Sequence, residues 1–296
     1  MKIAIFSRFL KQEHEIIIAE LFAEFSKRKH IKLFIFKEYL ESFDGRIDIV
    51  NEFETFTSYH DFKSLDIDFC LTLGGDGTIL EAVTVIRDSA VPIFGINLGR
   101  LGFLAMFEKN RISEVVTAIE QNNFIPDPRT LLSLDSSDDI FGETNFALND
   151  FTILKRDTSS MVIIHTYVNG EFLNSYWADG IIVATPTGST GYSLSCGGPI
   201  VFPRSGNFII TPVAPHNLNV RPIVLSDDVV ISFEIEGRAE NFLCTLDSRY
   251  HTIKSSCQLA VRRCPFTINL LRPNDRNFLY MIREKLHWGT DTRNYV

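Results

Sequence analysis

Apolar residues along the first third of the chain follow two periods, one typical of buried strands and one typical of amphipathic helices. Short continuous apolar runs predict strands at 3–6, 31–36, 67–73 and 91–96. Apolar residues spaced three and four apart predict helices at 15–25, 79–86 and 112–119. Strands that alternate with helices indicate βαβ units, so a parallel sheet covered by helices is expected here. Residues 38–64 carry no clear pattern and receive no predicted element.

The pattern changes at the Pro126-Asp127-Pro128 segment. From about Leu131 to Leu271, short β-branched and aromatic runs alternate with turn residues, and Asn169-Gly170 between two such runs is a strong hairpin signal. This stretch is predicted to be an all-β domain with the architecture of a sandwich. After Pro273, an amphipathic run at 279–286 predicts a helix, which needs an apolar surface to cover.

These patterns predict an α/β domain followed by a β domain. The expected boundaries are residues 1–126 for the α/β domain with its parallel sheet and residues 127–272 for the β-sandwich. Residues 273–296 are expected to pack back on the first domain.

The charge balance argues against nucleic acid as a partner. The net charge is −8, and the only dense basic run, at 27–30, is typical of a solvated helix end. An acidic protein can still bind phosphates where backbone N–H groups and a metal supply local positive potential.

Cysteine usage and hydropathy favour a cytoplasmic protein. The five cysteines form no C-x-x-C pair, so neither a disulfide framework nor a zinc site is expected. The chain opens on a strand-like run instead of a charged and apolar leader, and no apolar run reaches the roughly 18 residues of a membrane span.

Leu73 to Thr78 reads LGGDGT between a predicted strand and a predicted helix. The glycines let a bulky ligand approach the backbone, and the following helix offers free N–H groups to an anion. Asp76 would repel phosphate there unless it holds Mg²⁺ or removes a proton from a hydroxyl, and both tasks belong to phosphoryl transfer. The alternative is a tight turn with a capping aspartate. Neither a P-loop nor the G-x-G-x-x-G fingerprint of dinucleotide-binding folds is present.

Two later segments combine polar and small side chains. Asn149-Asp150, at the end of a strand-like run, suits the two hydroxyls of a ribose but is equally typical of a turn. Residues 179–195 (DGIIVATPTGSTGYSLS) lead from a buried strand into a loop of Gly, Ser and Thr. Ser189 and Thr190 can donate to phosphate or ribose oxygens, and Tyr192 can stack on an adenine. The alternative, a flexible linker, is disfavoured by a proline and the apolar flank.

Taken together, these segments resemble the NAD kinase family. GGDGT (74–78), GINLGRLGFLA (95–105), the Asn-Asp pair, residues 179–201 and PHNLNVRP (215–222) occur in the family's order and approximate spacing, over roughly residues 67–273. Lipid kinases share GGDGT, so the block at 179–201 makes the resemblance specific. His216, in the last segment, either contacts a substrate or only shapes its loop.

The resemblance implies a nucleotide-binding α/β domain, an NAD-binding β-sandwich and an active site between them. The implied reaction moves the γ-phosphoryl group of ATP to the 2′-hydroxyl of NAD's adenosine ribose, giving NADP and ADP. Asp76 matches the proton acceptor and is a candidate Mg²⁺ ligand by way of the nucleotide phosphates. The ATP-phosphate loop corresponds to Gly74, Gly75, Asp76, Gly77 and Thr78.

The remaining positions implied to contact nucleotide lie in the second domain. They are Asn149, Asp150, Asp179, Ala184, Thr187, Gly188, Ser189, Thr190, Gly191, Tyr192, Ser193, Leu194, Ser195 and Arg249. Asp179 matches a carboxylate near the nicotinamide, and the stretch from Thr190 to Ser195 matches contacts to adenosine. Trp177 and Arg249 depart from the residues that many bacterial members carry, and Arg249 would add a cation near bound phosphate.

The partners that this resemblance implies are ATP and NAD, with no nucleic acid and no membrane, in a homo-oligomeric cytoplasmic enzyme. A lipid kinase and an NAD-binding regulatory module are the alternatives. A lipid kinase would need an exposed apolar groove or a membrane-binding basic face, and this acidic chain offers no clear basic face. Polyphosphate as donor, NADH as acceptor and feedback by NADP(H) stay open.

Overall fold

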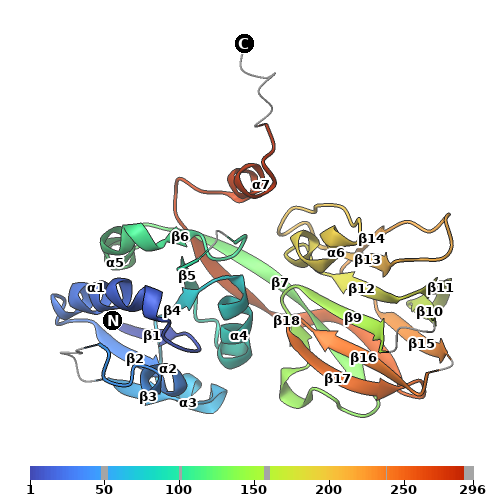
Figure 1. Ribbon diagram of the computed structural model, residues 1–296, viewed down its shortest axis with the longest axis horizontal. Helices are drawn as coiled ribbons and strands as arrows, with labels where there is room; N and C mark the ends of the chain where they lie inside the picture. The colour runs from blue at the N-terminus through green and yellow to red at the C-terminus, as the bar shows by residue number, and fades with distance from the viewer. Residues whose placement is uncertain (48–52, 100–101, 157–160, 238, 290–296) are drawn as a thin grey trace. The chain divides into compact units, whose positions relative to one another are not determined.

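The computed structural model describes residues 1–47, 53–99, 102–156, 161–237 and 239–289. The chain divides into two units, residues 1–128 with 268–296 (unit 1) and residues 129–267 (unit 2) (Figure 1). The expectation for 95–105 therefore falls partly outside the described residues, at 100–101.

A parallel sheet forms the centre of unit 1. Its strands are β1 (Lys2–Phe6), β2 (Lys32–Phe36), β3 (Glu54–Phe56), β4 (Phe69–Gly74) and β5 (Ile93–Asn97). They lie in the order β3-β2-β1-β4-β5, and β5 also pairs in parallel with β6 (Phe107–Glu108) and with the end of β18 (Leu259–Arg272). The chain runs outward from β1 to β3 and then returns to β4, so the strand order reverses between β1 and β4. That reversal matters because ligands of open α/β sheets bind outside the carboxyl ends of the strands at such a point.

Helices cover this sheet. They are α1 (Glu15–Ser26), α2 (Lys37–Glu41), α3 (Tyr59–Ser64), α4 (Asp76–Ile86) and α5 (Ile112–Gln121), with short 3-10 turns η1 (Gln12–His14), η2 (Arg87–Ser89) and η3 (Lys109–Arg111). α1 packs against α5, and α3 packs against α4. The strands and helices predicted in this region are confirmed, and α4 begins at Asp76, three residues earlier than the apolar pattern indicated.

The C-terminal helix α7 (Phe278–Leu286) belongs to unit 1, as predicted. The side chain of Asn277 caps it by accepting from the Tyr280 N–H at 2.9 Å, and its buried face presents Met281 and Ile282. The segment before it is held by Arg276, whose guanidinium donates to the Met106 carbonyl at 2.9 Å. Arg276 also donates to Glu108 Oε1 at 2.7 Å, so the segment that leads into α7 is tied to β6.

Two antiparallel sheets make up unit 2. The first contains β11 (Glu171–Ala178), β10 (Val162–Val168), β15 (Ile231–Gly237) and β18, with β7 (Ile125–Ser136) and β8 (Phe146–Ala147) alongside. The second has the order β14 (Ile223–Ser226), β13 (Asn207–Val213), β12 (Gly180–Ala184), β9 (Asp150–Lys155), β16 (Asn241–Leu246) and β17 (Arg249–Lys254). The connections include η4 (Gly142–Thr144), η5 (Gly188–Thr190) and α6 (Tyr192–Ser195).

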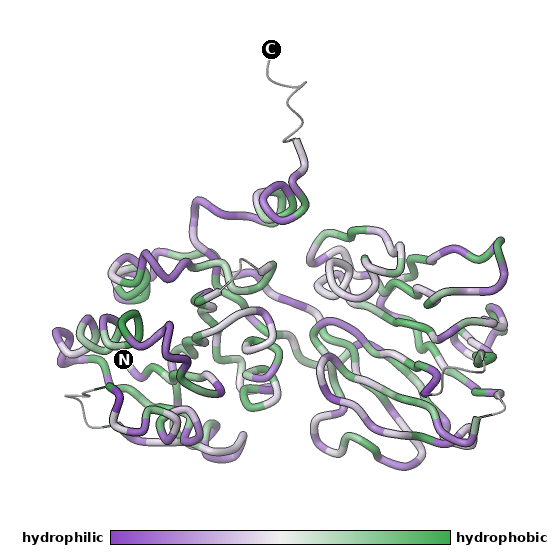
Figure 2. The backbone as a smooth tube through the Cα atoms, viewed as in Figure 1, coloured by the Kyte–Doolittle hydropathy of each residue, from purple (hydrophilic) through white to green (hydrophobic). Residues whose placement is uncertain are grey.

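The core of unit 2 lies between these sheets, so the predicted sandwich is confirmed. Phe151 of β9 and Phe233 of β15 meet there with ring centroids 5.5 Å apart. The predicted hairpin joins β10 to β11, where Asn169 and Gly170 take the positive φ angles of 52° and 83° that such a turn requires. In both units the strands are mostly hydrophobic and the connections mostly hydrophilic (Figure 2).

Two further features bear on the sequence expectations. Among the helices of the described residues, none has the length and apolar character that crossing a bilayer requires. The five cysteines are free thiols, and burial raises the pKa of Cys244 to about 12.

Candidate active site

The glycine loop joins β4 directly to α4. Gly74 ends the strand, and a Cβ atom there would lie 2.1 Å from Thr78 Oγ1, so the turn requires glycine at this position. A Cβ atom at Gly75 or Gly77 would meet no protein atom within 4 Å. Packing therefore does not explain these two glycines, whereas the approach of a ligand to the backbone would. The free N–H groups of the first turn of α4 face the same region.

Asp76, the first residue of α4, also binds the segment that follows β5. Its Oδ2 accepts from the Phe103 N–H at 2.7 Å, and its Oδ1 accepts from Leu104 and Ala105 at 3.0 and 3.1 Å. Gly102 makes this approach possible, because a Cβ atom there would lie 1.9 Å from Asp76 Oδ1. A carboxylate has about four acceptor positions, so three hydrogen bonds leave room for one further partner.

A cavity of about 340 Å³ borders this loop. Its lining includes Gly74, Gly75, Gly77 and Thr78 of the loop, together with residues of the segment from Ser7 to His14 that follows β1. The cavity thus lies outside the carboxyl ends of β1 and β4, where the strand order reverses.

A second group of candidate residues gathers in unit 2 around the turn at Asn149-Asp150. The Asp247 carboxylate holds that turn by accepting the N–H groups of Leu148, Asn149 and Asp150 at 2.9, 2.8 and 3.2 Å. A Cβ atom at Gly191 would lie 3.8 Å from Asp150 Oδ2 and 4.0 Å from Asn149 Nδ2. The structure therefore brings the Asn-Asp pair and the Gly/Ser/Thr loop together, although about 40 residues separate them in sequence.

The carboxyl group of Asp150 is buried beside a second carboxyl group. Asp150 is 7% exposed. Its burial and the neighbouring Asp247 carboxylate raise the pKa of Asp150 to about 7. Burial also raises the pKa of Asp247, against the three N–H groups that it accepts. A carboxyl group that is partly protonated near neutral pH can donate as well as accept hydrogen bonds, which suits hydroxyl ligands.

Tyr192 and Asp179 lie at the edge of the same group. Tyr192 is 40% exposed, and burial raises its pKa, with smaller contributions from Cys196, Asp150 and Asp179. Asp179 forms an ion pair with Lys155, with Nζ 2.6 Å from Oδ1. Asp179 therefore offers a carboxylate whose charge is already compensated.

Most hydroxyl groups of the loop are used to hold its own fold. Thr185 donates to the Leu148 carbonyl at 2.6 Å, and Ser189 donates to the Pro186 carbonyl at 2.7 Å. Ser193 pairs with Thr211 at 2.8 Å, and Thr187 accepts from the buried Arg129 at 3.3 Å. The loop is therefore a fixed element. Its remaining predicted members are the buried Ala184 and Gly188, the half-buried Thr190 and Leu194, and the exposed Ser195.

Arg249 and the backbone of His216 make local structural contacts. The Arg249 guanidinium donates to the carbonyl oxygens of Thr144 and Phe146, and burial lowers its pKa. It therefore holds the chain before β8. The His216 N–H donates to the Trp177 carbonyl at 2.8 Å, so the loop after β13 is tied to β11.

Comparison with known proteins finds a family model that matches each end of the chain. The model for the ATP-NAD kinase N-terminal domain matches residues 9–124, and the model for the ATP-NAD kinase C-terminal domain matches residues 148–272. The NAD kinase of Flavobacterium psychrophilum is 44% identical over 296 residues, covering 99% of this chain and all of that one. The chain belongs to the ATP-NAD kinase family.

Other members support the same assignment. The NAD kinase of Cytophaga hutchinsonii is 51% identical over 242 residues, which cover 82% of each chain. The NAD kinase of Archaeoglobus fulgidus, solved in complex with ATP, superposes with a TM-score of 0.70 at 26% identity, covering 96% of this chain and 99% of that one. The yeast NADH kinase, solved with NADH, shares the fold, with a TM-score of 0.88 at 22% identity over 98% of this chain and 88% of that one.

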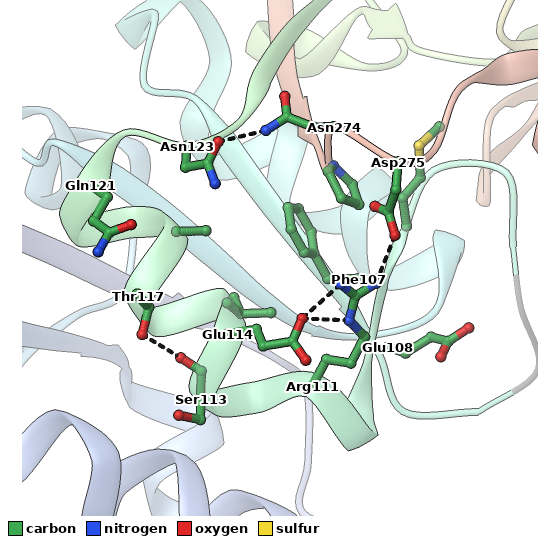
Figure 3. Close-up of a pocket in the computed structure, with 14 residues that line it drawn as sticks. Phe107, Glu108, Arg111, Ser113, Glu114, Thr117, Gln121, Asn123, Asn274 and Asp275 are labelled. Atoms are coloured by element: carbon green, nitrogen blue, oxygen red, sulfur yellow. Dashed lines mark hydrogen bonds and ion pairs between the residues drawn. The ribbon is translucent and has the colours of Figure 1, made fainter.

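The predicted site residues do not line another cavity of unit 1. That cavity, of about 480 Å³, lies between α5 and the segment after β18 (Figure 3). Arg111 lines that cavity and forms ion pairs with Glu114 and Asp275, and no glycine loop or helix N-terminus of the predicted site borders it. The smaller cavity at the glycine loop is the better match to a phosphate ligand.

Three features of the candidate site in this kinase could not be predicted from the sequence. Asp247, which holds the Asn-Asp turn, follows a plain strand and gives no motif. Lys155, the partner of Asp179, lies 24 residues before it in sequence. The segment from Ser7 to His14 reads as an ordinary connection, and only the order of the strands reveals that it faces the glycine loop.

Proposed function

We propose that this kinase transfers the γ-phosphoryl group of ATP to the 2′-hydroxyl of the adenosine ribose of NAD, giving NADP and ADP. The supporting observation is the carboxylate of Asp76, which stands at the N-terminus of α4 inside a glycine loop and keeps an acceptor position open. A pure NAD-binding module has no use for a carboxylate among phosphates, and a lipid kinase would not match both family domain models.

The phosphates of ATP would lie on the loop from Gly74 to Thr78, against the N–H groups of α4. Asp76 accepts the proton of the 2′-hydroxyl while the 2′-oxygen attacks the γ-phosphorus. The bond from the γ-phosphorus to the bridging oxygen breaks in line with this attack, and ADP leaves. The three N–H groups on Asp76 keep its carboxylate in place through this step. Positioning and charge neutralisation would supply most of the rate enhancement.

Mg²⁺ fits this site as a companion of the nucleotide. Among the described residues, no group of three or more His, Cys, Asp or Glu side chains is placed to hold a metal ion. Mg²⁺ at kinase sites needs only one or two carboxylates together with substrate phosphates, and Asp76 is the candidate protein ligand. When bound, the ion neutralises charge on the phosphate oxygens.

NAD would occupy the group in unit 2. Asn149 and Asp150 offer an amide and a partly protonated carboxyl group to ribose hydroxyls, and Tyr192 offers an exposed ring to the adenine. Asp179, paired with Lys155, is proposed to lie near the nicotinamide. Arg249 is engaged with two carbonyl groups, so we assign it no direct contact with phosphate.

The decisive experiment is NADP formation by the purified chain with ATP, Mg²⁺ and NAD, compared with Asp76→Asn. General-base assistance contributes about 10²–10⁴-fold, so turnover should fall by at least that range. Because the Asn amide would also turn a donor toward one of the N–H groups, thermal unfolding and NAD binding by calorimetry must be recorded alongside. A folded, NAD-binding Asp76→Asn variant with near wild-type turnover would show that Asp76 is not the base.

The cytoplasmic location, the homo-oligomeric assembly and the role in NADP biosynthesis stay predictions from the sequence. Cell fractionation, light scattering and NADP levels after gene deletion would test them in turn.

A further inference from the structure

The segment from Ser7 to His14 has a fixed backbone and exposed side chains. The Ser7 hydroxyl donates to the Leu73 carbonyl of β4 at 2.6 Å, and the Leu10 N–H donates to Ser42 Oγ at 2.8 Å. Arg46 donates to the Leu10 carbonyl at 3.1 Å. Ser7 and Leu10 are buried, whereas Arg8, Phe9 and Lys11 are exposed. A backbone anchored at Ser7 and Leu10, with charged side chains exposed beside these anchors, is typical of a binding loop on a rigid scaffold.

This segment lines the same cavity as the glycine loop. It leaves the carboxyl end of β1, and Ser7, Arg8, Phe9, Lys11, Glu13 and His14 border the cavity of about 340 Å³ together with the start of α4. The Ser7–Leu73 hydrogen bond joins the ends of β1 and β4 at the reversal of strand order. Because a ligand of such a sheet occupies this crevice, whatever lies on the glycine loop also faces Arg8 and Lys11.

Arg8 is held in a defined position within this segment. Its Nε donates to Glu81 Oε2 at 2.7 Å, and its Nη1 lies 3.4 Å from Glu38 Oε2. Glu81 stands in the second turn of α4, so it fixes the guanidinium beside the N-terminus of that helix. A guanidinium carries five N–H donors, and these two contacts leave the Nη2 donors for a ligand.

The charges around the cavity make Arg8 the main candidate for binding an anionic ligand there. Glu13 and Glu81 line the cavity, and the whole chain carries a net charge of −8. Burial lowers the pKa of His14, so this imidazole is neutral near pH 7. Positive charge on this segment therefore comes from Arg8 and Lys11. Arg8 alone combines a positioned planar fork with free donors, the geometry that suits phosphate oxygens.

We propose that Arg8 binds phosphate oxygens of the donor ATP in the cavity that it shares with the Gly74–Thr78 loop. The proposal rests on the proposed kinase function for the identity of its ligand, whereas the contact itself would suit any linear triphosphate. Arg8 is a donor-binding residue in this view, and it makes no contact with NAD.

The test compares Arg8→Gln, Arg8→Lys and the wild-type chain in steady-state assays with ATP varied and then with NAD varied. A hydrogen bond to a charged group contributes about 1.5–3 kcal/mol, so Arg8→Gln should raise the KM for ATP by about 10–100-fold. Arg8→Lys keeps the charge but loses the fork, so it should lie between the two. The KM for NAD should stay within about twofold of wild type.

Arg111→Gln is the matched control, because it removes the same charge from an ion-paired arginine of unit 1 that lies in the other cavity. Its KM for ATP should match wild type. Calorimetry with inorganic tripolyphosphate and Mg²⁺ measures the phosphate contact without the reaction. Unchanged tripolyphosphate affinity and unchanged KM for ATP in Arg8→Gln overturn the proposal. Wild-type protein that binds tripolyphosphate through Arg8 yet forms no NADP would instead count against the proposed function.

Discussion

At the scale of single residues, the carboxyl group of Asp150 is buried beside a second carboxyl group, that of Asp247, and the nearby Arg249 cation favours the charged form of Asp247. Asp247 accepts three backbone N–H groups, which stabilise its charged form, whereas no comparable donors reach Asp150 among the hydrogen bonds of the described residues. The proton shared by such a pair therefore resides mainly on Asp150.

This pair predicts a stability that falls as the pH rises. The pKa of Asp150 is about 7 in the folded chain and about 3.9 in the unfolded chain, so between these values the folded state binds more protons. The free energy of unfolding should fall with rising pH through this window, by up to about 1.4 kcal/mol per pH unit from this group. Urea unfolding of the ligand-free protein between about pH 4.5 and 7.5 should show a flatter slope for Asp150→Asn.

The exposed Asp228→Asn is the control for that measurement, and its slope should match wild type. If Asp150→Asn and wild type have the same slope, Asp150 is ionised throughout the window and its assignment as a hydrogen-bond donor to ribose is wrong.

The contacts of Arg249 predict that its replacement lowers the stability of the protein without changing substrate binding. Replacing Arg249 with Gln removes the donors to the Thr144 and Phe146 carbonyls and the cation near the Phe146 ring. The loss should be about 1–3 kcal/mol in the free energy of unfolding, measured by urea titration, with little change in the KM for ATP or NAD. A rise in either KM at unchanged stability would restore the phosphate-binding role that the sequence indicated.

At the scale of elements, the start of α4 depends on the segment that follows β5. Asp76 is the first residue of the helix and the acceptor for the N–H groups of 103–105, so it joins two pieces of chain that meet only in the folded state. Gly102 provides the space for this contact.

Gly102→Ala should therefore damage both stability and activity. The added Cβ atom would lie within 2.5 Å of three atoms of the Asp76 carboxyl group, so either the helix start or the segment must move. We expect a loss of about 1–3 kcal/mol and a fall in turnover, measured by thermal unfolding and NADP formation.

The Gly77→Ala variant distinguishes an effect on packing within the protein from an effect on ligand binding. Its Cβ atom meets no protein atom within 4 Å, so stability should be unchanged or slightly raised, while the KM for ATP rises because the methyl group faces the phosphates.

For the other glycine variant, wild-type stability in Gly102→Ala would contradict the close approach of Gly102 to Asp76.

At the scale of the whole molecule, the net negative charge of the chain should make binding of the donor nucleotide depend on cations. The chain carries −8, and its described residues contain no cluster of side chains able to hold a metal without the nucleotide. The metal should therefore arrive with ATP.

Chelation should abolish NADP formation, and excess Mg²⁺ should restore it. With Mn²⁺ as a paramagnetic probe, the ligand-free protein should bind the ion weakly, and addition of ATP should bring it tightly into the complex. Tight Mn²⁺ binding to the protein alone would reveal a resident metal site, which the described side chains do not provide. Full turnover in the presence of a chelator would show that the reaction needs no metal ion.

Elements with strong periodic patterns were predictable from the sequence. The strands and helices at 3–6, 15–25, 67–73 and 112–119 bury long apolar runs, and such runs determine secondary structure locally. Residues 38–64 were not predictable, although α2, β3 and α3 lie there, because each is short and buries only single aromatic side chains such as Phe56 and Phe62. Tertiary packing supplies their stability.

The sequence by itself determined the two fold classes, the family and the glycine loop, because these depend on local periodicity and on motifs whose residues are neighbours in the chain. Tertiary structure decided how the chemical groups are used. It gave Asp76 three N–H partners from 103–105, placed Asp247 under the Asn149-Asp150 turn, paired Lys155 with Asp179, and paired Arg8 with Glu81 beside the cavity at the glycine loop. Each of these contacts joins residues that are distant along the chain, and their pairing depends on strand order and loop packing, which no local pattern records.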